Sequence, residues 1–171
     1  MKPVLIHTHF HKRKTGVTRS IENVLPFFTD DFETYVYGSN IDGNKITTSK
    51  LKSLLFSDRK TVVHCHRNNE IIRMLCYRFL GGKFTLIATR HAETIPSGLT
   101  KFLLNKADKV ITLIKSMSNN LGIENKFQGL LKAVNYNSKK TKEFKNDKNN
   151  SELSGGIGYL AKLGLYKNNL S

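Results

Sequence analysis

"VLIHTHFHKRKTGVTRSIENVL", residues 4–25, contains three kinds of sequence in the order that opens an α/β domain. The run Val4–His7 is apolar and rich in β-branched residues, as expected for a buried strand. A basic loop containing Gly16 follows, and apolar residues then recur at helical spacing. That stripe consists of Val17, Ile21, Val24, Leu25 and Phe28. We expect Thr18 to cap this helix and Pro26 to limit its end.

The same alternation of strand-like and helix-like segments continues to residue 134. Further apolar, β-branched runs occupy Thr34–Tyr37, Thr61–His66, Phe84–Thr89 and Val110–Leu113. Between them, Asn68 is placed to cap a helix that extends to Leu80, and Ser97 and Ser116 to cap helices near 98–106 and 116–121. Strands that alternate with helices predict a parallel sheet with helices on both faces. We therefore assign residues 1–134 to a Rossmann-like α/β domain.

The chain changes character after residue 134. Residues 135–152, "NYNSKKTKEFKNDKNNSE", are nearly all polar and predict a solvated linker. Residues 153–171 include "GGIGYLAKLGLYKNN", which is typical of one strand followed by a glycine turn. A single strand cannot bury itself. We therefore expect this segment to be the truncated start of a C-terminal domain.

The composition is that of a basic globular protein. The net charge is +15 over 171 residues, and most of the excess lies within residues 1–134. Such a field attracts nucleic acid, anionic lipid or phosphorylated substrates. Nucleic acid is not expected, because the chain has no aromatic-basic RNA-recognition motif. No run of about 18 apolar residues encodes a membrane span. We predict a cytoplasmic protein that can dock peripherally on the inner face of the cytoplasmic membrane, with Cys65 and Cys76 as buried, reduced thiols.

All six histidines of the chain lie at or just after the ends of predicted strands. His7, His9 and His11 leave the first strand, His64 and His66 close the third, and His91 follows the fourth. In an open parallel sheet, ligands bind outside the carboxyl ends of the strands. The histidines, together with Arg67 and Arg90, therefore predict a shared ligand site at that edge of the sheet.

Two chemistries fit such a site to different degrees. "HTHFH" offers alternating imidazoles to a metal, but the nearest candidate carboxylates are Glu70 and Glu93, and neighbouring cations would repel a dication. We therefore predict no metal ion. "HKRKTGVTRS" has the order of loop, glycine and helix start that forms an anion site, although it matches neither a dinucleotide fingerprint nor a Walker loop. This order favours an anionic partner without naming it.

Four segments, "IHTHFHKRKTGVTRSIENVLP", "VVHCHRNNEI", "LIATRHAETIPSGLTKFLLNKADKVITL" and "GYLAKLG", follow one another along the chain. Together they resemble the family 4 glycosyltransferases of the two-domain GT-B fold, and in particular the lipopolysaccharide core mannosyltransferases. The resemblance covers residues 3–122 and implies the N-terminal, acceptor-side domain. It implies transfer of a hexose, such as mannose, from a nucleotide-sugar donor to an anionic glycolipid acceptor. The anomeric configuration is retained, and neither a cofactor nor an essential metal is needed.

The resemblance also implies roles for individual residues. His91 matches the catalytic histidine that lies against the donor sugar, and Gly16 with Thr15 matches the loop near the donor phosphates. The expected acceptor clamp consists of Lys12, Arg13, Lys14 and Arg67. The rest of the cleft is expected to contain His9, His11, His64, His66, Arg90 and Glu93.

The chain departs from the family pattern toward its C-terminal end. After Phe127 the family has a short motif ending in Asp, where this chain has "GLLKAVNYN", and Tyr159 stands near the position of a diphosphate-binding Arg. The family's second domain carries that Arg, a Lys and the nucleoside-binding glutamates. We therefore expect residues 1–171 to fold but to transfer no sugar without a separate C-terminal half. The alternatives are a non-catalytic basic module that binds anionic lipid or nucleic acid, and a histidine-rich metal-dependent hydrolase.

Overall fold

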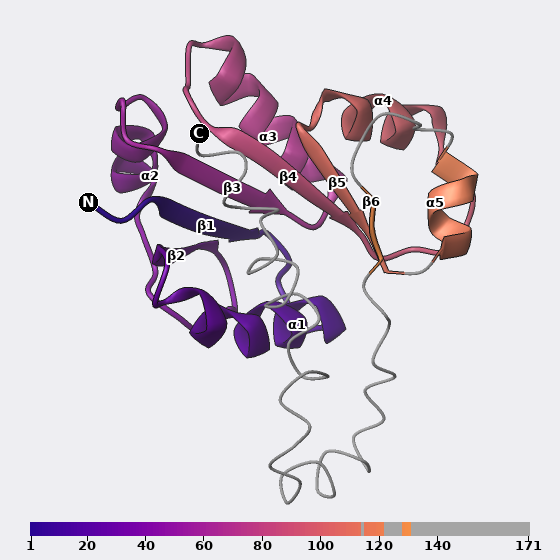
Figure 1. Ribbon diagram of the computed structural model, residues 1–171, viewed down its shortest axis with the longest axis horizontal. Helices are drawn as coiled ribbons and strands as arrows, with labels where there is room; N and C mark the ends of the chain where they lie inside the picture. Colours follow the sequence, from indigo (N-terminus) through magenta and orange to yellow (C-terminus); the bar gives the residue numbers. More distant parts are fainter. Residues whose placement is uncertain (114, 122–127, 131–171) are drawn as a thin grey trace, which may run out of the picture.

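The computed structural model describes residues 1–113, 115–121 and 128–130, which form one parallel sheet with helices on both faces (Figure 1). The sheet has six strands in the order β2-β1-β3-β4-β5-β6, and every neighbouring pair is parallel. The strands are β1 (Val4–His9), β2 (Glu33–Gly38), β3 (Thr61–Cys65), β4 (Thr85–Arg90), β5 (Lys109–Thr112) and β6 (Gln128–Leu130). The predicted Rossmann-like α/β fold is confirmed. The strand order reverses between β1 and β3, and this is where doubly wound sheets bind their ligands.

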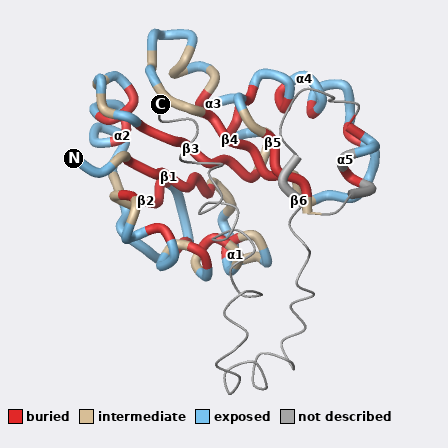
Figure 2. Tube along the Cα trace, in the orientation of Figure 1, coloured by how far each residue is buried: buried red, intermediate tan, exposed pale blue. Residues whose placement is uncertain are grey.

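The helices lie on the two faces of the sheet. On one face are α2 (Thr48–Leu55), α3 (Asn68–Phe79), α4 (Gly98–Lys106) and α5 (Lys115–Leu121). On the other face are α1 (Gly16–Val24) and the 3₁₀ helix η1 (Leu25–Phe28). Because alternate residues of a strand face opposite sides, each strand contributes to both cores. Ile6 and Val63 pack under α2 and α3, whereas Leu5, Val62 and Ile87 pack against Val24 and Phe28. The strands are buried along most of their length (Figure 2).

Two predicted helix caps are wrong by a few residues. Thr15, in extended conformation, precedes α1, and its amide donates to the Thr18 hydroxyl at 2.9 Å, so Thr18 lies inside the first turn. Arg67 is the cap residue of α3, and Asn68 is its first helical residue. The cap at Ser97 is confirmed, because its hydroxyl accepts from the Thr100 amide. The predicted cap at Ser116 lies outside the side chains that the structure describes.

Two elements were not predicted, and one cysteine is placed differently. Helix α2 is short and follows a loop, and β6 has only three residues. Cys65 is buried in β3 as predicted, but Cys76 is exposed. The buried stripe of α3 contains Glu70, Ile71 and Met74, and Cys76 lies off that stripe. The predicted linker 135–152 and the segment 153–171 lie outside the described residues. Among the described helices, none has the length and apolarity needed to cross a bilayer.

Candidate functional site

Strand register brings histidines from two strands into contact. His7 of β1 pairs in register with His64 of β3, and both side chains point to the α1 face of the sheet because they share the parity of Leu5 and Val62. Both residues are fully buried, with ring centroids 4.8 Å apart. His66 follows β3 directly, and its ring lies 4.3 Å from that of His64. With His91 after β4, these residues form what we call the histidine cluster: His7, His64, His66 and His91.

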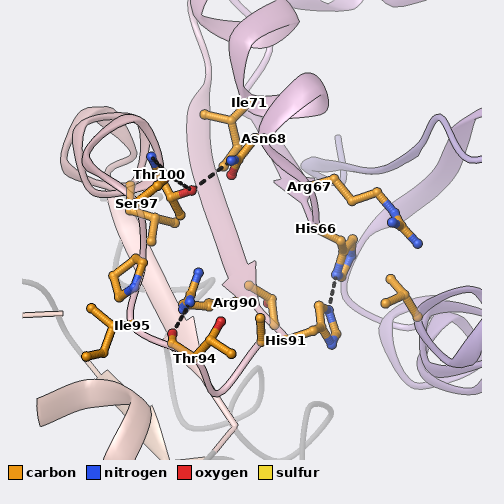
Figure 3. A pocket seen from close by; sticks show the side chains of 15 residues that line it. His66, Arg67, Asn68, Ile71, Arg90, His91, Thr94, Ile95, Ser97 and Thr100 are labelled. Carbon is orange, nitrogen blue, oxygen red and sulfur yellow. Dashed lines mark hydrogen bonds between the residues drawn. The ribbon is translucent and has the colours of Figure 1, made fainter. Parts of the chain in front are cut away.

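Contacts between ring nitrogens connect His7, His66 and His91 into a chain that ends at the partly exposed His91. A dashed line in Figure 3 marks the contact between His66 and His91. His66 Nδ1 lies 3.1 Å from His91 Nε2, and His66 Nε2 lies 3.4 Å from His7 Nδ1. His64 Nε2 lies 2.6 Å from the Thr89 hydroxyl. At the inner end, His7 Nε2 is buried and has no hydrogen-bond partner among the described residues. The cluster therefore links the interior of the sheet to His91.

Burial keeps the cluster uncharged at neutral pH. Desolvation lowers the pKa of His7 to about 3, because a buried imidazolium loses its hydration. The pKa values of His64 and His66 are also well below the usual value, mainly through burial and then through neighbouring histidines. Burial lowers the pKa of His91 to about 4, with a smaller contribution from the charge of Arg67. Each ring is thus a neutral donor and acceptor at pH 7.

A pocket of about 510 Å³ opens beside His66 and His91 (Figure 3). It lies between the carboxyl ends of β3 and β4 and the first turns of α3 and α4. The lining residues are Val17, His66, Arg67, Asn68, Ile71, Thr89, Arg90, His91, Ala92, Thr94, Ile95, Pro96, Ser97, Thr100 and Leu104. The pocket thus combines imidazoles, guanidinium groups, hydroxyls and an apolar wall, a combination suited to a polar, anionic ligand.

The two arginines of the pocket are held by backbone and hydroxyl oxygens. Arg67 donates to the Thr15 hydroxyl at 3.4 Å, and its buried Nε has no partner among the described residues. Arg90 donates to the carbonyl of Thr94 in the loop that follows β4. Neither contact uses a carboxylate, so both guanidinium groups retain their positive charge for an anion in the pocket.

Glu70 supports the strand ends that carry the histidines. This fully buried carboxylate accepts from the His66 amide at 2.7 Å, the Thr8 hydroxyl at 3.0 Å and the Phe10 amide at 3.2 Å. It therefore ties the end of β1 to the turn between β3 and α3. Burial raises the pKa of Glu70, although these three bonds act in the opposite direction. The sequence suggested Glu70 only as a metal ligand or first-turn anion, because the partners at Thr8 and Phe10 are distant in the chain.

The structure places part of the predicted site at the pocket and part elsewhere. His66, Arg67, Arg90 and His91 line the pocket. His64 lies behind them in the cluster, where it contacts Thr89. Besides His64, the predicted site residues that do not line the pocket are His9, His11, Lys12, Arg13, Lys14, Thr15, Gly16 and Glu93. Thr89, Ser97 and Thr100 line it without having been predicted, because single hydroxyl residues give no distinctive sequence signal.

The basic loop before α1 has its own contacts. His9 lies 2.8 Å from both the Ser39 carbonyl and the Thr18 hydroxyl through its two ring nitrogens. Lys14 forms salt bridges with Asp42 and Glu22 at 2.5 and 3.2 Å, so its charge is already paired. His11 accepts from the Arg13 amide. The remaining residues are Lys12, Arg13 and Gly16, which are exposed, as is Glu93 in the loop after β4.

Comparison with protein-family models, with curated proteins and with solved structures found no match. The fold and the site therefore define the class of the molecule only as a doubly wound α/β domain with a basic, histidine-lined pocket at its ligand-binding edge.

Proposed function

We propose that residues 1–134 are the acceptor-side domain of a retaining, nucleotide-sugar-dependent glycosyltransferase that transfers mannose or another hexose in lipopolysaccharide core synthesis. The observation that carries the proposal is the pocket at the carboxyl ends of β3 and β4, where His91 lies with Arg67 and Arg90. The presence of His91 and Arg67 at the pocket supports the roles that the resemblance implies for these two residues, whereas the implied residues Lys12, Arg13, Lys14, Thr15 and Gly16 lie outside its lining. The acceptor in this proposal is an anionic glycolipid.

His91 would act as a neutral hydrogen-bonding group. Its low pKa leaves the ring uncharged at pH 7, so it does not repel the positive charge that develops on the donor sugar in an oxocarbenium-like transition state. His66 Nδ1 is the hydrogen-bond partner of His91 Nε2, and this contact orients the His91 ring toward the pocket. Nδ1 of His91 is then the nitrogen available to a sugar hydroxyl. Arg67 and Arg90 would hold phosphate groups of the acceptor.

The nucleotide of the donor is placed outside this domain in the proposal. In the family that the sequence resembles, the diphosphate-binding Arg and Lys and the nucleoside-binding glutamates belong to the second domain. A separate C-terminal half is therefore a proposed partner, and sugar transfer would require it. The direct test for residues 1–171 is binding of a phosphorylated sugar at the pocket.

Binding of mannose 6-phosphate, with mannose as the uncharged comparison, tests the proposal by nuclear magnetic resonance titration of the full chain. We expect shifts at His66 and His91 with the phosphorylated sugar and a loss of at least about tenfold in affinity for Arg67→Ala, since one charge-assisted bond contributes about 1.5–3 kcal/mol. Lys83→Ala is the matched control, because Lys83 pairs with Asp58 away from the pocket. Equal losses in the two variants, or no shift at His91, would contradict the proposal.

A membrane surface is the proposed location of the acceptor. Ile95, Leu99 and Phe102 are exposed on or just before α4, and the exposed Lys101 and Lys106 flank them. Apolar side chains among lysines suit contact with an anionic interface. We expect the chain to bind vesicles containing anionic lipid, with affinity that falls as salt increases. Equal binding to neutral vesicles in a sedimentation assay would refute the electrostatic part of this proposal.

A further inference from the structure

Three buried imidazoles in the histidine cluster are arranged as a ligand set. His7, His64 and His66, which we call the imidazole triad, each offer a nitrogen, and these nitrogens lie within 4.8 Å of one another. All three residues are buried. We propose that the imidazole triad binds one transition-metal dication, with Zn²⁺ as the first choice. This site shares His66 with the pocket, but the argument for it does not depend on the sugar-binding role proposed there.

The distances within the imidazole triad fit a tetrahedral ion. Zinc–imidazole bonds are about 2.0–2.1 Å long, which places two nitrogens of a tetrahedral site about 3.4 Å apart. His7 Nδ1 and His66 Nε2 are already 3.4 Å apart, longer than the usual nitrogen hydrogen bond of about 2.7–3.2 Å. The largest separation of 4.8 Å closes by small rotations of imidazole rings.

The other nitrogen of His7 is an alternative ligand atom. His7 Nε2 is buried without a hydrogen-bond partner among the described residues, and such a group costs about 1–3 kcal/mol. A bound ion removes this cost if it uses that nitrogen. If it uses Nδ1 instead, it replaces the long contact with His66. Imidazole nitrogens are ligands that suit zinc and its neighbours rather than magnesium or calcium.

The charges around the imidazole triad are less repulsive than the sequence indicated. The expectation of no metal relied on cations in the basic loop, but Lys14 is neutralised by Glu22 and Asp42, and the neighbouring cations of that loop are exposed to solvent, which screens them. The carboxylate of Glu70 accepts from the His66 amide on the α3 side of the sheet, where it fixes the backbone that carries His66. Arg67 remains the nearby cation, on the pocket side of His91.

Three imidazole nitrogens leave one position of a tetrahedral ion open. The open coordination position would face Thr89 or the pocket wall at His66, because both residues line the pocket and Thr89 contacts His64.

The test uses the 171-residue chain without a histidine tag, dialysed against chelator and then titrated with Zn²⁺ by calorimetry. We expect one ion per chain, a raised thermal midpoint and, with Co²⁺, the visible absorption of a tetrahedral nitrogen site. His7→Gln and His64→Gln should each weaken Zn²⁺ binding at least 100-fold. The matched controls are His9→Gln, which replaces a buried histidine on the same strand but outside the imidazole triad, and His11→Gln, which replaces a partly exposed one.

Each outcome decides the proposal. One equivalent of Zn²⁺ with a tetrahedral Co²⁺ spectrum supports it even if a triad variant fails to fold, because the wild-type spectrum identifies the ligand type. Binding well below one ion per chain overturns it, and the imidazole triad is then a hydrogen-bonded network only. Equal weakening by the controls and the triad variants also overturns it. Phosphorylated-sugar binding is measured separately, so the two proposals can fail independently.

Discussion

Mild acid should destabilise this protein through its buried histidines. His7 is fully buried, and its pKa falls from 6.5 to about 3 on folding, so the unfolded chain binds a proton that the folded chain excludes. Its contribution to stability is complete above pH 6.5 and is lost progressively as the pH falls toward 3. The free energy of unfolding should therefore decrease between pH 7 and pH 5.

The size of the effect follows from the shift. For one histidine with these two pKa values, lowering the pH from 7 to 5 costs roughly 2 kcal/mol at 1.36 kcal/mol per pKa unit. His91, with a pKa of about 4, adds a loss of similar size, and His64 and His66 add losses of the same sign. Against a typical total of about 5–15 kcal/mol, a loss of this size is a measurable fraction of the free energy of unfolding.

Urea denaturation of chelator-treated protein at pH 7, 6 and 5 measures this loss. His7→Gln should flatten the pH dependence by roughly 2 kcal/mol, because it removes one titrating group. Val63→Ala is the control: it removes buried methyl groups without changing a charge, so its curve should run parallel to that of the wild type.

The carboxyl group of Glu70 changes the pH dependence of stability in the opposite direction, so its contribution must be measured apart from that of the histidines. The raised pKa of Glu70 means that the folded state takes up a proton more readily than the unfolded state, so acid favours folding at this residue. Urea denaturation of the Glu70→Gln variant at the same three pH values removes the contribution of Glu70. A free energy of unfolding that is equal at pH 7 and pH 5 in both backgrounds would refute the claim that the cluster is buried and neutral.

Three further outcomes test the packing around the site. Gly38→Ala should destabilise the fold by more than about 2 kcal/mol by thermal denaturation, because φ is +135° and a Cβ would lie 1.9 Å from the His9 carbonyl oxygen; unchanged stability would contradict this geometry. Thiol titration should modify Cys76 in the native protein and Cys65 only after unfolding, since Cys65 is buried and its thiol pKa is raised; two fast thiols would disprove this burial. Glu70→Gln should cost about 1–3 kcal/mol at pH 7, because an amide nitrogen would face N–H and O–H donors, and an unaltered urea midpoint would argue against the three bonds.

The pattern of hydrophobic residues predicted the architecture because apolar residues recur at a clear spacing in each long strand or helix. Strand β3 is buried along its whole length and begins with three β-branched residues, and α1 carries its apolar stripe at helical spacing, so both were recognised from the sequence alone. Helix α2 was missed because its eight residues include several polar ones, and β6 because three residues hold no periodic signal. The position of Thr18 within α1 depended on one turn of backbone geometry, which is below the precision of pattern reasoning.

The sequence predicted where the candidate site lies in the sheet, but it did not predict which side chains contact one another there. The rule that ligands bind at carboxyl strand ends brought His66 and His91 together correctly. The meeting of His7 with His64 depends on register, which the sequence does not reveal. His9, two residues after His7 on the same strand face, instead contacts Thr18 of α1, because it lies at the very end of β1. Such differences arise from tertiary packing and not from local pattern.

The position of β1 between β2 and β3 has a consequence for how the sheet forms during synthesis. Among the strands of this sheet β1 leaves the ribosome first, and one of its two neighbours, β3, ends only at Cys65. Because synthesis proceeds at roughly 5–20 residues per second, several seconds pass before β1 can pair with a strand on each of its two edges. During that interval a chaperone can hold them, and afterwards their amides should be the slowest in the molecule to exchange with deuterium. The first of these strands to be synthesised is thus expected to be the last to reopen.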